Sequence, residues 1–500
     1  MSTKTLYPAT LLCDFYKVSH REQYREGTEK VYSTWTPRTS RKEGINKVVC
    51  FGIQAFIKQY LIDYFNEHFF SRDKFEVVDE YERVIKNTLG VQNVDIAHII
   101  ALHELGYLPI KIKAVREGIR VPIRVPMFTI ENTIDKFFWL TNYLETLMSC
   151  QLWQPMTSAT IALEYRKLVE EYALETVGNI LHVPFQCHDF SLRGMGSLES
   201  SITSGAGHLL SFVGTDSIPS ILFMEEYYNG DIEKQLIGTS IPATEHSVMC
   251  VDGDADEIGT FRRLLTKVYP AGFFSVVSDT WNLWTVLTEY LPILKDEVLA
   301  RDGRCVIRPD SGNPVKIICG DPDAEVGSPE YKGVVELLWE IFGGTETEKG
   351  YRQLDSHIGA IYGDSITVER ARAICEGLKA KGFASSNIVF GVGSYTYQYN
   401  TRDTFGFALK ATYAKVNGEE KMLFKDPITD NGTKRSQKGM LVVLEDEAAG
   451  LKYIDGLNEE TIKEYEAVNV LETVFENGKL LIDQSIEDIR NTLTNGVWEQ

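Results

Sequence analysis

Short apolar runs that stop abruptly at polar or glycine-rich turns recur through the second half of this chain. The run at residues 305–307 ends at Arg308, Pro309 and Asp310, and three others end similarly: 273–277 before Ser278-Asp279, 358–362 before Gly363-Asp364, and 387–390 before Gly391-Val392-Gly393-Ser394. Parallel α/β proteins carry functional residues on the loops that follow their strands. The pattern therefore predicts three acids, an arginine and a glycine-rich turn around one rim, which suits a polyanion with a metal.

Helical patterns separate these runs, at residues 281–294, 330–342 and 366–381. Such alternation implies parallel strands joined by crossover helices. For residues 151–399 we favour a (β/α) barrel-like domain over an open doubly wound sheet, because polar groups follow nearly every strand instead of a single switch point. The predicted fold class is α/β plus β.

The N- and C-terminal segments, residues 1–150 and 400–500, predict a second, mixed α+β domain of antiparallel sheets. Residues 110–133 alternate apolar and polar side chains, interrupted by Pro122 and Pro126, which favours edge strands. Asn417-Gly418 and Asn477-Gly478 lie between apolar runs and predict tight hairpins. A third hairpin is expected at 441–454, a polar loop at 34–41, and helices at 9–26, 52–65, 95–105, 137–153, 159–176 and 485–493.

Size and composition exclude several classes of protein. A chain of 500 residues exceeds the usual single domain, so two domains are expected. The formal net charge of −20 argues against nucleic-acid or anionic-membrane partners, because both need a basic surface. The eight scattered cysteines favour a reduced, cytoplasmic protein. No stretch approaches the ~20 apolar residues of a spanning helix, and the N-terminus has no apolar leader.

Several residues near the predicted rim suit phosphate and metal chemistry. Asp279 and Asp310 could hold Mg²⁺ together with phosphate oxygens, or could simply cap helices. The turns at Gly363-Asp364 and Gly393-Ser394 could present backbone N–H groups to a phosphate. His246 lies between Glu245 and Ser247, which suits phosphate or proton chemistry, although a lone histidine is more often structural.

Two further features are open to a plain structural interpretation. Phe190 follows His188 and Asp189, and it could be a core residue or an exposed ring. Residues 402–438 contain eight basic and five acidic side chains, a local net charge of +3 in an acidic chain. Such a stretch is either a solvated hairpin face or a site for anions.

Taken together, the ordered motifs resemble the nicotinamide phosphoribosyltransferase family, a group of type II phosphoribosyltransferases. The motifs that carry the resemblance are Asp14-Phe15-Tyr16-Lys17-Val18-Ser19-His20, His188-Asp189-Phe190, Gly214-Thr215-Asp216, Glu245-His246-Ser247, Ser275-Val276-Val277-Ser278-Asp279, Ile307-Arg308-Pro309-Asp310-Ser311-Gly312-Asn313-Pro314, Thr401-Arg402-Asp403 and Phe424-Lys425-Asp426-Pro427. The resemblance implies transfer of phosphoribose from 5-phosphoribosyl-1-pyrophosphate to nicotinamide, with Mg²⁺ as cofactor and ATP as co-substrate. It also implies a homodimer, in which each active site lies between one subunit's barrel and its partner's other domain.

The resemblance assigns a role to each candidate residue. Phe190 and the partner subunit's Tyr16 would sandwich the pyridine ring, and Asp216 would accept the carboxamide N–H, with Ser240, Ser275 and Arg308 also at the substrate. Asp310 would bind the ribose hydroxyls and, with Asp279, Mg²⁺. The ribose phosphate side would be lined by Arg193, Gly363, Asp364, Gly393 and Ser394. Pyrophosphate and ATP phosphates would meet Arg38, Arg402, Lys410, Lys425 and Lys434. His246 matches the histidine that the family phosphorylates from ATP.

The chain departs from the vertebrate pattern near the phosphate, at Ser191-Leu192, Ser365 and the turn that ends at Ser394. Two rival functions remain. A nicotinate phosphoribosyltransferase shares the expected fold, and Asp216 is the feature against it because an acid repels the carboxylate of nicotinic acid. A non-catalytic nucleotide-binding or signalling protein would be expected to lose the acids or the histidine, yet His246, Asp279 and Asp310 are all present.

Overall fold

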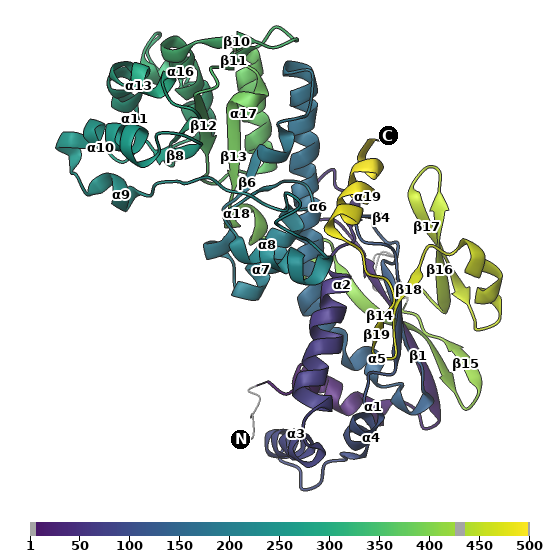
Figure 1. Cartoon of the computed structure of the whole chain (residues 1–500). Helices are drawn as coiled ribbons and strands as arrows, with labels where there is room; N and C mark the ends of the chain where they lie inside the picture. Colours follow the sequence, from purple (N-terminus) through teal and green to yellow (C-terminus); the bar gives the residue numbers. More distant parts are fainter. Residues whose placement is uncertain (1–6, 426–435, 499–500) are drawn as a thin grey trace. The chain divides into compact units, whose positions relative to one another are not determined.

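The computed structural model describes residues 7–425 and 436–498, with side chains to residue 494 (Figure 1). The chain divides into two compact units. The first, called here the terminal unit, contains the described residues up to Thr160, Met224–Gly230, and those from Thr401 onward. The second, the barrel unit, contains Ile161–Phe223 and Asp231–Asn400. Residues 151–160 and 224–230 thus belong to the terminal unit, although the sequence assigned both segments to the barrel domain.

The barrel unit is organised around six parallel strands, in the order β7 (Gly214–Thr215), β6 (Cys187–Asp189), β13 (Ile388–Val392), β12 (Ile358–Tyr362), β9 (Cys305–Arg308) and β8 (Phe274–Val277). Isolated parallel bridges join Gly214 to Thr239 and Ala243 to Ser275. Residues 239–243 therefore close the sheet between β7 and β8. Neighbours around the resulting ring follow one another along the chain, as in a (β/α) barrel.

Helices around this sheet cover its outer side (Figure 1). Strands β8, β9, β12 and β13 are mainly apolar because parallel strands of this kind are buried on both faces, and Val276, Ile307 and Phe390 are fully buried. The α-helices of the unit are α7 (Leu198–His208), α8 (Ile218–Tyr228, whose residues from 224 on belong to the terminal unit), α9 (His246–Cys250), α10 (Glu257–Arg263), α11 (Leu283–Thr285), α12 (Leu291–Ile293), α13 (Lys295–Leu299), α14 (Pro314–Cys319), α15 (Pro329–Lys332), α16 (Val334–Phe342), α17 (Val368–Ala380) and α18 (Ser394–Tyr397).

A single helix, α6 (Glu145–Thr176), replaces the two helices that the sequence predicted at 137–153 and 159–176. Pro155 lies inside it, and a Cβ at Gly52 would lie 2.8 Å from the proline ring, so a neighbouring segment packs closely at this point. The division between the two units falls within this helix, after Thr160. Tertiary packing here overrides the local tendency of proline to end a helix.

The terminal unit contains a seven-stranded antiparallel sheet, ordered β15 (Glu419–Met422), β14 (Phe407–Val416), β1 (Thr28–Pro37), β5 (Phe128–Asn132), β3 (Ile110–Ala114), β18 (Glu472–Glu476) and β19 (Lys479–Leu480). Strands β3 and β5 are therefore interior, and the prediction of edge strands there was wrong. The proline interruptions lie elsewhere: Pro122 ends β4 (Arg120–Pro122), which pairs with β2 (Lys47–Val49).

The predicted polar loop at 34–41 was also wrong over its first half, because residues 34–37 complete β1. Trp35 is fully buried, and its ring stacks between Phe128 and Phe407, with centroids 5.8 and 5.4 Å away. The polar residues Thr34 and Thr36 alternate with it on the opposite face of the strand. Trp35 thus packs in the core on one face of the sheet, while Thr34 and Thr36, also buried, line a cavity on the other face, and Arg38 follows the end of β1.

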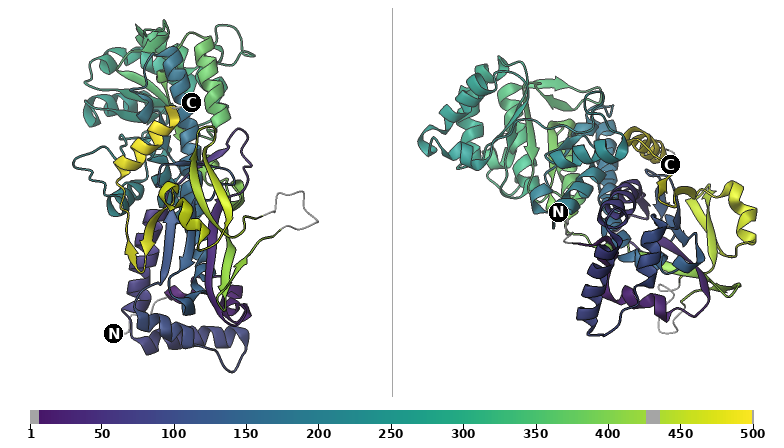
Figure 2. Two further views of the ribbon diagram at one scale, coloured as in Figure 1. Left: turned by 90° about the vertical axis from the view of Figure 1, so that its right-hand side faces the viewer. Right: turned by 60° about the horizontal axis from the view of Figure 1, so that its bottom comes forward.

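The three predicted hairpins are confirmed. Asn417 and Gly418 join β14 to β15 with φ angles of 50° and 75°, and Asn477 and Gly478 join β18 to β19 with 50° and 79°. These left-handed angles are those that make Asn-Gly the favoured two-residue turn. The third hairpin, β16 (Met440–Asp446) with β17 (Gly450–Leu457), forms a separate two-stranded ladder (Figure 2).

The helices predicted at 52–65, 95–105 and 485–493 are present, whereas the helix at Lys74–Leu89 was not predicted and the one at 9–26 is broken. Residues 9–26 form three short pieces, Ala9–Leu11, Phe15–Ser19 and α1 (His20–Gln23), instead of one helix. The break falls at Asp14, whose backbone N–H and carboxylate both bond to the Thr146 hydroxyl, at 3.1 and 2.8 Å. The other helical segments are α2 (Ile53–Phe56), Ile57–Tyr64, Asn66–Phe70, α3 (Lys74–Leu89), α4 (Ala97–Leu105), α5 (Leu140–Tyr143) and α19 (Ile486–Trp498).

Across the described ranges 7–425 and 436–498, the helices are too short or too polar to cross a membrane.

Candidate active site

The carboxyl ends of the barrel strands bring most of the predicted site residues to one rim. Parallel strands end at the same side of a barrel, so the residues that follow them are neighbours. They are Phe190 after β6, Asp216 after β7, Ser240 in the closing segment, Ser275 and Asp279 on or after β8, Arg308 and Asp310 on or after β9, Gly363 and Asp364 after β12, and Gly393 and Ser394 after β13.

Asp279 is the most constrained acid of the rim. Its side chain is 5% exposed, and its Oδ2 accepts the backbone N–H of Asp310 at 2.8 Å and the Ser311 hydroxyl at 2.6 Å. Its Oδ1 is buried, without a hydrogen-bond partner within the described part of the chain, and lies 3.5 Å from His246 Nε2. A buried carboxylate oxygen left in this state is available to a cation or a donor of a ligand.

The interpretation of Asp279 and Asp310 as helix caps was wrong. Helix α11 is capped by Asn282 and α14 by Asn313, whose side chains accept the backbone N–H groups of the first turns. The two acids instead face Tyr362. Burial raises the pKa of the Tyr362 phenol well above its usual range, and the negative charges of Asp364, Asp279 and Asp310 raise it further. Three carboxylates therefore converge on one small region.

This acidic region meets one requirement of a magnesium site. The described residues hold no group of three or more His, Cys, Asp or Glu side chains that could bind a metal by themselves. Mg²⁺ usually takes one or two carboxylates and completes its shell with water and substrate phosphate oxygens. Asp279, with its free Oδ1, and Asp310 fit that pattern.

His246 is the first residue of α9, and half of its side chain is exposed. The exposed imidazole faces Asp279 on one side, and its neighbours Glu245 and Ser247 bond to each other. The sequence interpretation of a structural histidine is not supported by this exposure, because a histidine that stabilises a fold is usually buried and bonded. The ring is accessible to a ligand.

Asp216 is held as an anion at the other side of the rim. Burial raises the pKa of its carboxyl, but hydrogen bonds from His188 and Ser240 and the charge of Arg308 outweigh burial, so the pKa is below its usual value. His188 Nε2 and the Ser240 hydroxyl each lie 2.8 Å from Asp216 Oδ1. His188 was not predicted as a site residue, although it directly precedes Asp189-Phe190 in the sequence.

Phe190 is half-buried, so it is neither a fully buried core residue nor a fully exposed ring. Its backbone N–H donates to Val392 O at 3.0 Å, which ties it to β13. A Cβ at Gly363 or Gly391 would lie 2.7 or 2.4 Å from the ring. Both glycines are therefore required for the ring to occupy this position.

Two buried donors on the paired strands β8 and β9 lack hydrogen-bond partners among the described residues. Arg308 donates from Nη2 to the Thr244 carbonyl at 2.9 Å, but its buried Nε has no hydrogen-bond partner among the described residues. The same is true of the buried Ser275 hydroxyl. Because buried polar atoms are nearly always satisfied in proteins, these two atoms are available to donate to water or to a bound ligand.

On the expected phosphate side, Arg193 is exposed and Ser394 opens α18. Gly194 and Ser394 approach closely, since a Cβ at Gly194 would lie 2.1 Å from Ser394 Oγ. Ser365 adopts a left-handed φ of 54°, and its hydroxyl donates to Asp364 at 3.0 Å. Ser365 and Ser394, where the chain departs from the vertebrate pattern, thus both make close contacts on the expected phosphate side.

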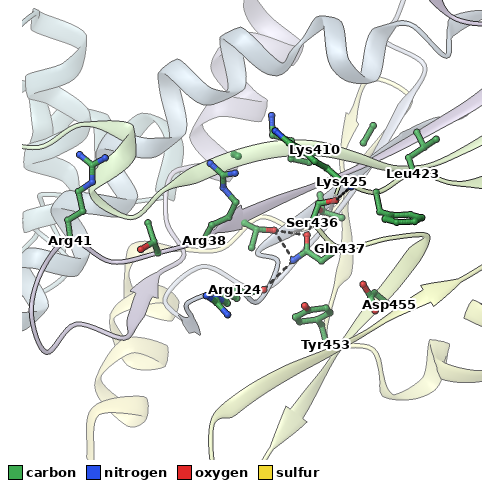
Figure 3. A pocket seen from close by; sticks show the side chains of 16 residues that line it. Arg38, Arg41, Arg124, Lys410, Leu423, Lys425, Ser436, Gln437, Tyr453 and Asp455 are labelled. Carbon is green, nitrogen blue, oxygen red and sulfur yellow. Dashed lines mark hydrogen bonds between the residues drawn. The ribbon is translucent and has the colours of Figure 1, made fainter. Parts of the chain in front are cut away.

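The remaining predicted residues belong to the terminal unit. There, a cavity of about 1080 Å³ is lined by Arg38, Lys410 and Lys425, together with Arg41 and Arg124 (Figure 3). Burial lowers the pKa of Lys410, and the charges of Arg38, Lys17 and Arg402 lower it further. Lys410 and Lys425 are exposed but line this concave surface, and the interpretation of residues 402–438 as a site for anions stays a prediction.

Not every predicted cation lines this cavity. Arg402 is exposed outside its wall, and Lys434 lies outside the described residues. Tyr16 is 56% exposed.

Arg124 lines the cavity but was not predicted, and nothing in its sequence context marks it. It reaches the cavity because β4 and β5 are joined by a turn in which Arg124 has a φ of 76°. Gln437 bonds to the Arg124 carbonyl at 3.2 Å and receives the Thr34 hydroxyl at 3.0 Å.

Comparison with known proteins identifies the family. Residues 185–479 match the nicotinate phosphoribosyltransferase family, and residues 9–112 match the N-terminal domain of nicotinamide phosphoribosyltransferase. A nicotinamide phosphoribosyltransferase of Acinetobacter baylyi is 52% identical over 96% of both chains. The chain belongs to the nicotinamide phosphoribosyltransferase family. Another relative of that name, from Mycoplasma pneumoniae, is 38% identical over 86% of this chain and 94% of the relative.

Two solved structures share the fold of this family member. Nicotinate-nucleotide pyrophosphorylase of Pyrococcus furiosus has a TM-score of 0.58 at 14% identity and covers 99% of this chain and 97% of its own. Human nicotinic acid phosphoribosyltransferase has a TM-score of 0.56 at 13% identity. The match covers 97% of this chain and 93% of the human chain. At such identities the likeness concerns the fold, and it agrees with a parallel α/β sheet accompanied by antiparallel sheets.

Proposed function

We propose that this chain transfers phosphoribose from 5-phosphoribosyl-1-pyrophosphate to nicotinamide, giving nicotinamide mononucleotide and pyrophosphate, a step of NAD salvage. The relatives that share 52% and 38% of their residues with it bear the name of this activity. In the reaction, the bond from the sugar carbon to the pyrophosphate oxygen breaks and a bond to the pyridine nitrogen forms. The nitrogen uses its own lone pair, so no protein nucleophile is needed.

The Asp216 carboxylate, with His188 Nε2 and the Ser240 hydroxyl each 2.8 Å from its Oδ1, supports the choice of substrate. A carboxylate whose pKa lies below its usual value accepts the N–H of a carboxamide and repels a carboxylate. The exposed side of the Phe190 ring would stack on the pyridine, while Gly363 and Gly391 fix the ring from behind. The free Ser275 hydroxyl and Arg308 Nε would donate to the carboxamide oxygen.

In this proposal, the positive charge of the sugar and the negative charge of the leaving pyrophosphate are each stabilised in the transition state. The sugar becomes cationic as pyrophosphate leaves, and the carboxylates of Asp279, Asp310 and Asp364 provide negative potential. Asp310 would also bind the ribose hydroxyls, and Arg193, Gly393 and Ser394 the 5-phosphate. Asp279 and Asp310 would hold Mg²⁺, which when bound neutralises pyrophosphate oxygens.

We also propose a homodimer with shared active sites, and the division of these residues between the two units supports it. The barrel rim has acids and a ring but few cations, whereas the terminal unit has a cation-lined cavity. We propose that Arg38, Arg402, Lys410, Lys425 and Lys434 of one subunit serve the pyrophosphate and ATP at the barrel of the other. The partner subunit's Tyr16, exposed in this structure, would cover the second face of the pyridine.

ATP would act through His246. A ring nitrogen of the imidazole would take the γ-phosphoryl group as ADP leaves, and water would later release phosphate and restore the histidine. The exposure of His246 supports this role, and so does its distance of 3.5 Å from Asp279, which would orient the ring.

All eight cysteines are free, in keeping with a reducing cytoplasmic compartment.

A nicotinate phosphoribosyltransferase is the second candidate, because residues 185–479 match that family. The deciding experiment offers nicotinamide and nicotinic acid separately to the purified protein with Mg²⁺ and 5-phosphoribosyl-1-pyrophosphate, with and without ATP, and quantifies the mononucleotide. We expect product from nicotinamide, and a shift toward nicotinic acid in Asp216→Asn. Product mainly from nicotinic acid in the unmodified protein would overturn the substrate, and binding without product would favour a non-catalytic protein.

A further inference from the structure

The cavity of the terminal unit has two chemically different ends (Figure 3). Arg38, Arg41 and Arg124 lie toward one end, whereas Leu423, Tyr453 and Asp455 lie toward the other. Phe424 also lines it. Pyrophosphate needs only the cations, and a cavity of about 1080 Å³ is slightly larger than the range of about 300–1000 Å³ that is usual for whole small-molecule ligands. The aromatic and acidic end therefore calls for a separate explanation.

Tyr453 and Asp455 are placed together by their strand. They are two residues apart on β17, so their side chains project from the same face. Tyr453 is partly buried against the core of the terminal unit, which fixes its ring. Phe424, by contrast, is 62% exposed although it lines a cavity. An exposed aromatic side chain and an anchored one in the same cavity offer surfaces on which a flat ring can stack.

Asp455 is the one acid among the described residues that line this cation-rich cavity. Its Oδ2 accepts the backbone N–H of Lys438 at 3.0 Å, and no bond of its Oδ1 occurs within the described ranges. A carboxylate weakens a site for bare polyphosphate, because like charges repel. It strengthens a site for a ligand that also carries N–H or O–H donors, as the base and the ribose of a nucleotide do.

We propose that this cavity binds a complete nucleoside triphosphate, with its phosphates on the arginines and lysines and its nucleoside at Tyr453, Phe424 and Asp455. Asp455 Oδ1 accepts a hydrogen bond from the nucleoside, and the aromatic rings stack on the base. Tyr453 and Asp455 are therefore specificity-determining residues that separate ATP from pyrophosphate. This inference rests on the proposed use of ATP and names the part of the site that recognises it.

The test compares two ligands that share the phosphates and differ in the nucleoside. Binding of MgATP and of magnesium tripolyphosphate to the full-length protein is measured by calorimetry. Asp455→Ala and Tyr453→Leu should each weaken ATP by about tenfold, from the loss of one hydrogen bond or one stacked ring. Tripolyphosphate should bind unchanged to Tyr453→Leu and more tightly to Asp455→Ala. Tyr453→Phe, which keeps the ring, should bind ATP normally and shows that the fold tolerates substitution there.

Glu445→Ala is the matched control for charge, because Glu445 is an exposed acid of the same hairpin that does not line the cavity. It should alter neither ligand. Equal weakening of ATP and tripolyphosphate by Asp455→Ala or Tyr453→Leu would overturn the inference, and so would unchanged ATP binding in both. These binding measurements do not require turnover. A failure to make mononucleotide would therefore refute the proposed reaction, while the binding of ATP and tripolyphosphate would still test this inference.

Discussion

Replacing Gly391 with alanine tests whether the position of the Phe190 ring determines nicotinamide binding. The added Cβ would lie 2.4 Å from ring atoms Cδ2 and Cε2 of Phe190 and 2.6 Å from the Gly363 Cα. Carbon atoms normally pack at about 3.5–4.0 Å, so the ring must move by about 1 Å or more. Moving the ring does not relieve the contact with the Gly363 Cα, which is backbone, so the paired strands β12 and β13 must also separate locally.

The size of the effect follows from the cost of overpacking. Forcing an extra methyl group into a packed site typically costs about 1–3 kcal/mol. If that cost falls on the contact between the ring and the pyridine, the KM for nicotinamide rises about 5- to 150-fold, since about 1.4 kcal/mol corresponds to a factor of ten. A ring displaced by about 1 Å also lowers kcat, because the pyridine nitrogen is no longer aligned with the sugar.

Initial rates at varied nicotinamide and saturating 5-phosphoribosyl-1-pyrophosphate measure both constants, and thermal unfolding shows whether the variant is folded. Gly196→Ala is the matched control, because its Cβ would meet the Gln398 side chain at an ordinary 3.6 Å. A folded Gly391→Ala protein with unchanged KM and kcat would refute the argument that the glycines position the ring.

Three further predictions concern the histidine, the metal and a buried acid. His246→Ala should abolish stimulation by ATP while ATP-independent turnover persists, and acid-labile phosphate on the protein after incubation with labelled ATP should disappear with it. Asp279→Asn should raise the Mg²⁺ concentration for half-maximal activity at least tenfold, because it removes the charge of a buried ligand, and an unchanged Mg²⁺ dependence would contradict this role. Burial raises the pKa of Glu117 to about 7 from 4.5, despite hydrogen bonds from Gln54, Gly52 and Tyr228. A carboxyl whose pKa is higher in the folded state stabilises the fold fully below its unfolded pKa, and that stabilisation is lost as the pH rises through the folded value. Between pH 4.5 and 7.5 the protein should therefore lose up to about 3 kcal/mol relative to Glu117→Gln, measured by urea unfolding of both proteins, and parallel pH profiles would refute it.

The sequence alone predicted the local features of this protein well. Apolar runs that ended at Asp279, Asp310 and Asp364 indicated barrel strands because burial on both faces requires continuous apolar residues. Asn417-Gly418 indicated a hairpin because few residues tolerate left-handed backbone angles. In both cases the physical cause lies within a few consecutive residues, so a pattern of neighbours is sufficient evidence.

The tertiary structure decided everything that depends on distant residues meeting. Trp35 is buried in a strand because Phe128 and Phe407 enclose it, although its polar neighbours resemble a loop. Residues 239–243 close the barrel through two isolated bridges, which leave no periodic pattern in the sequence. Arg124 reaches the anion cavity through one left-handed turn. The sequence by itself thus determined the strand ends and turns of the rim, whereas only packing decided which side chains share a site, because packing depends on shape complementarity between segments that are far apart in the chain.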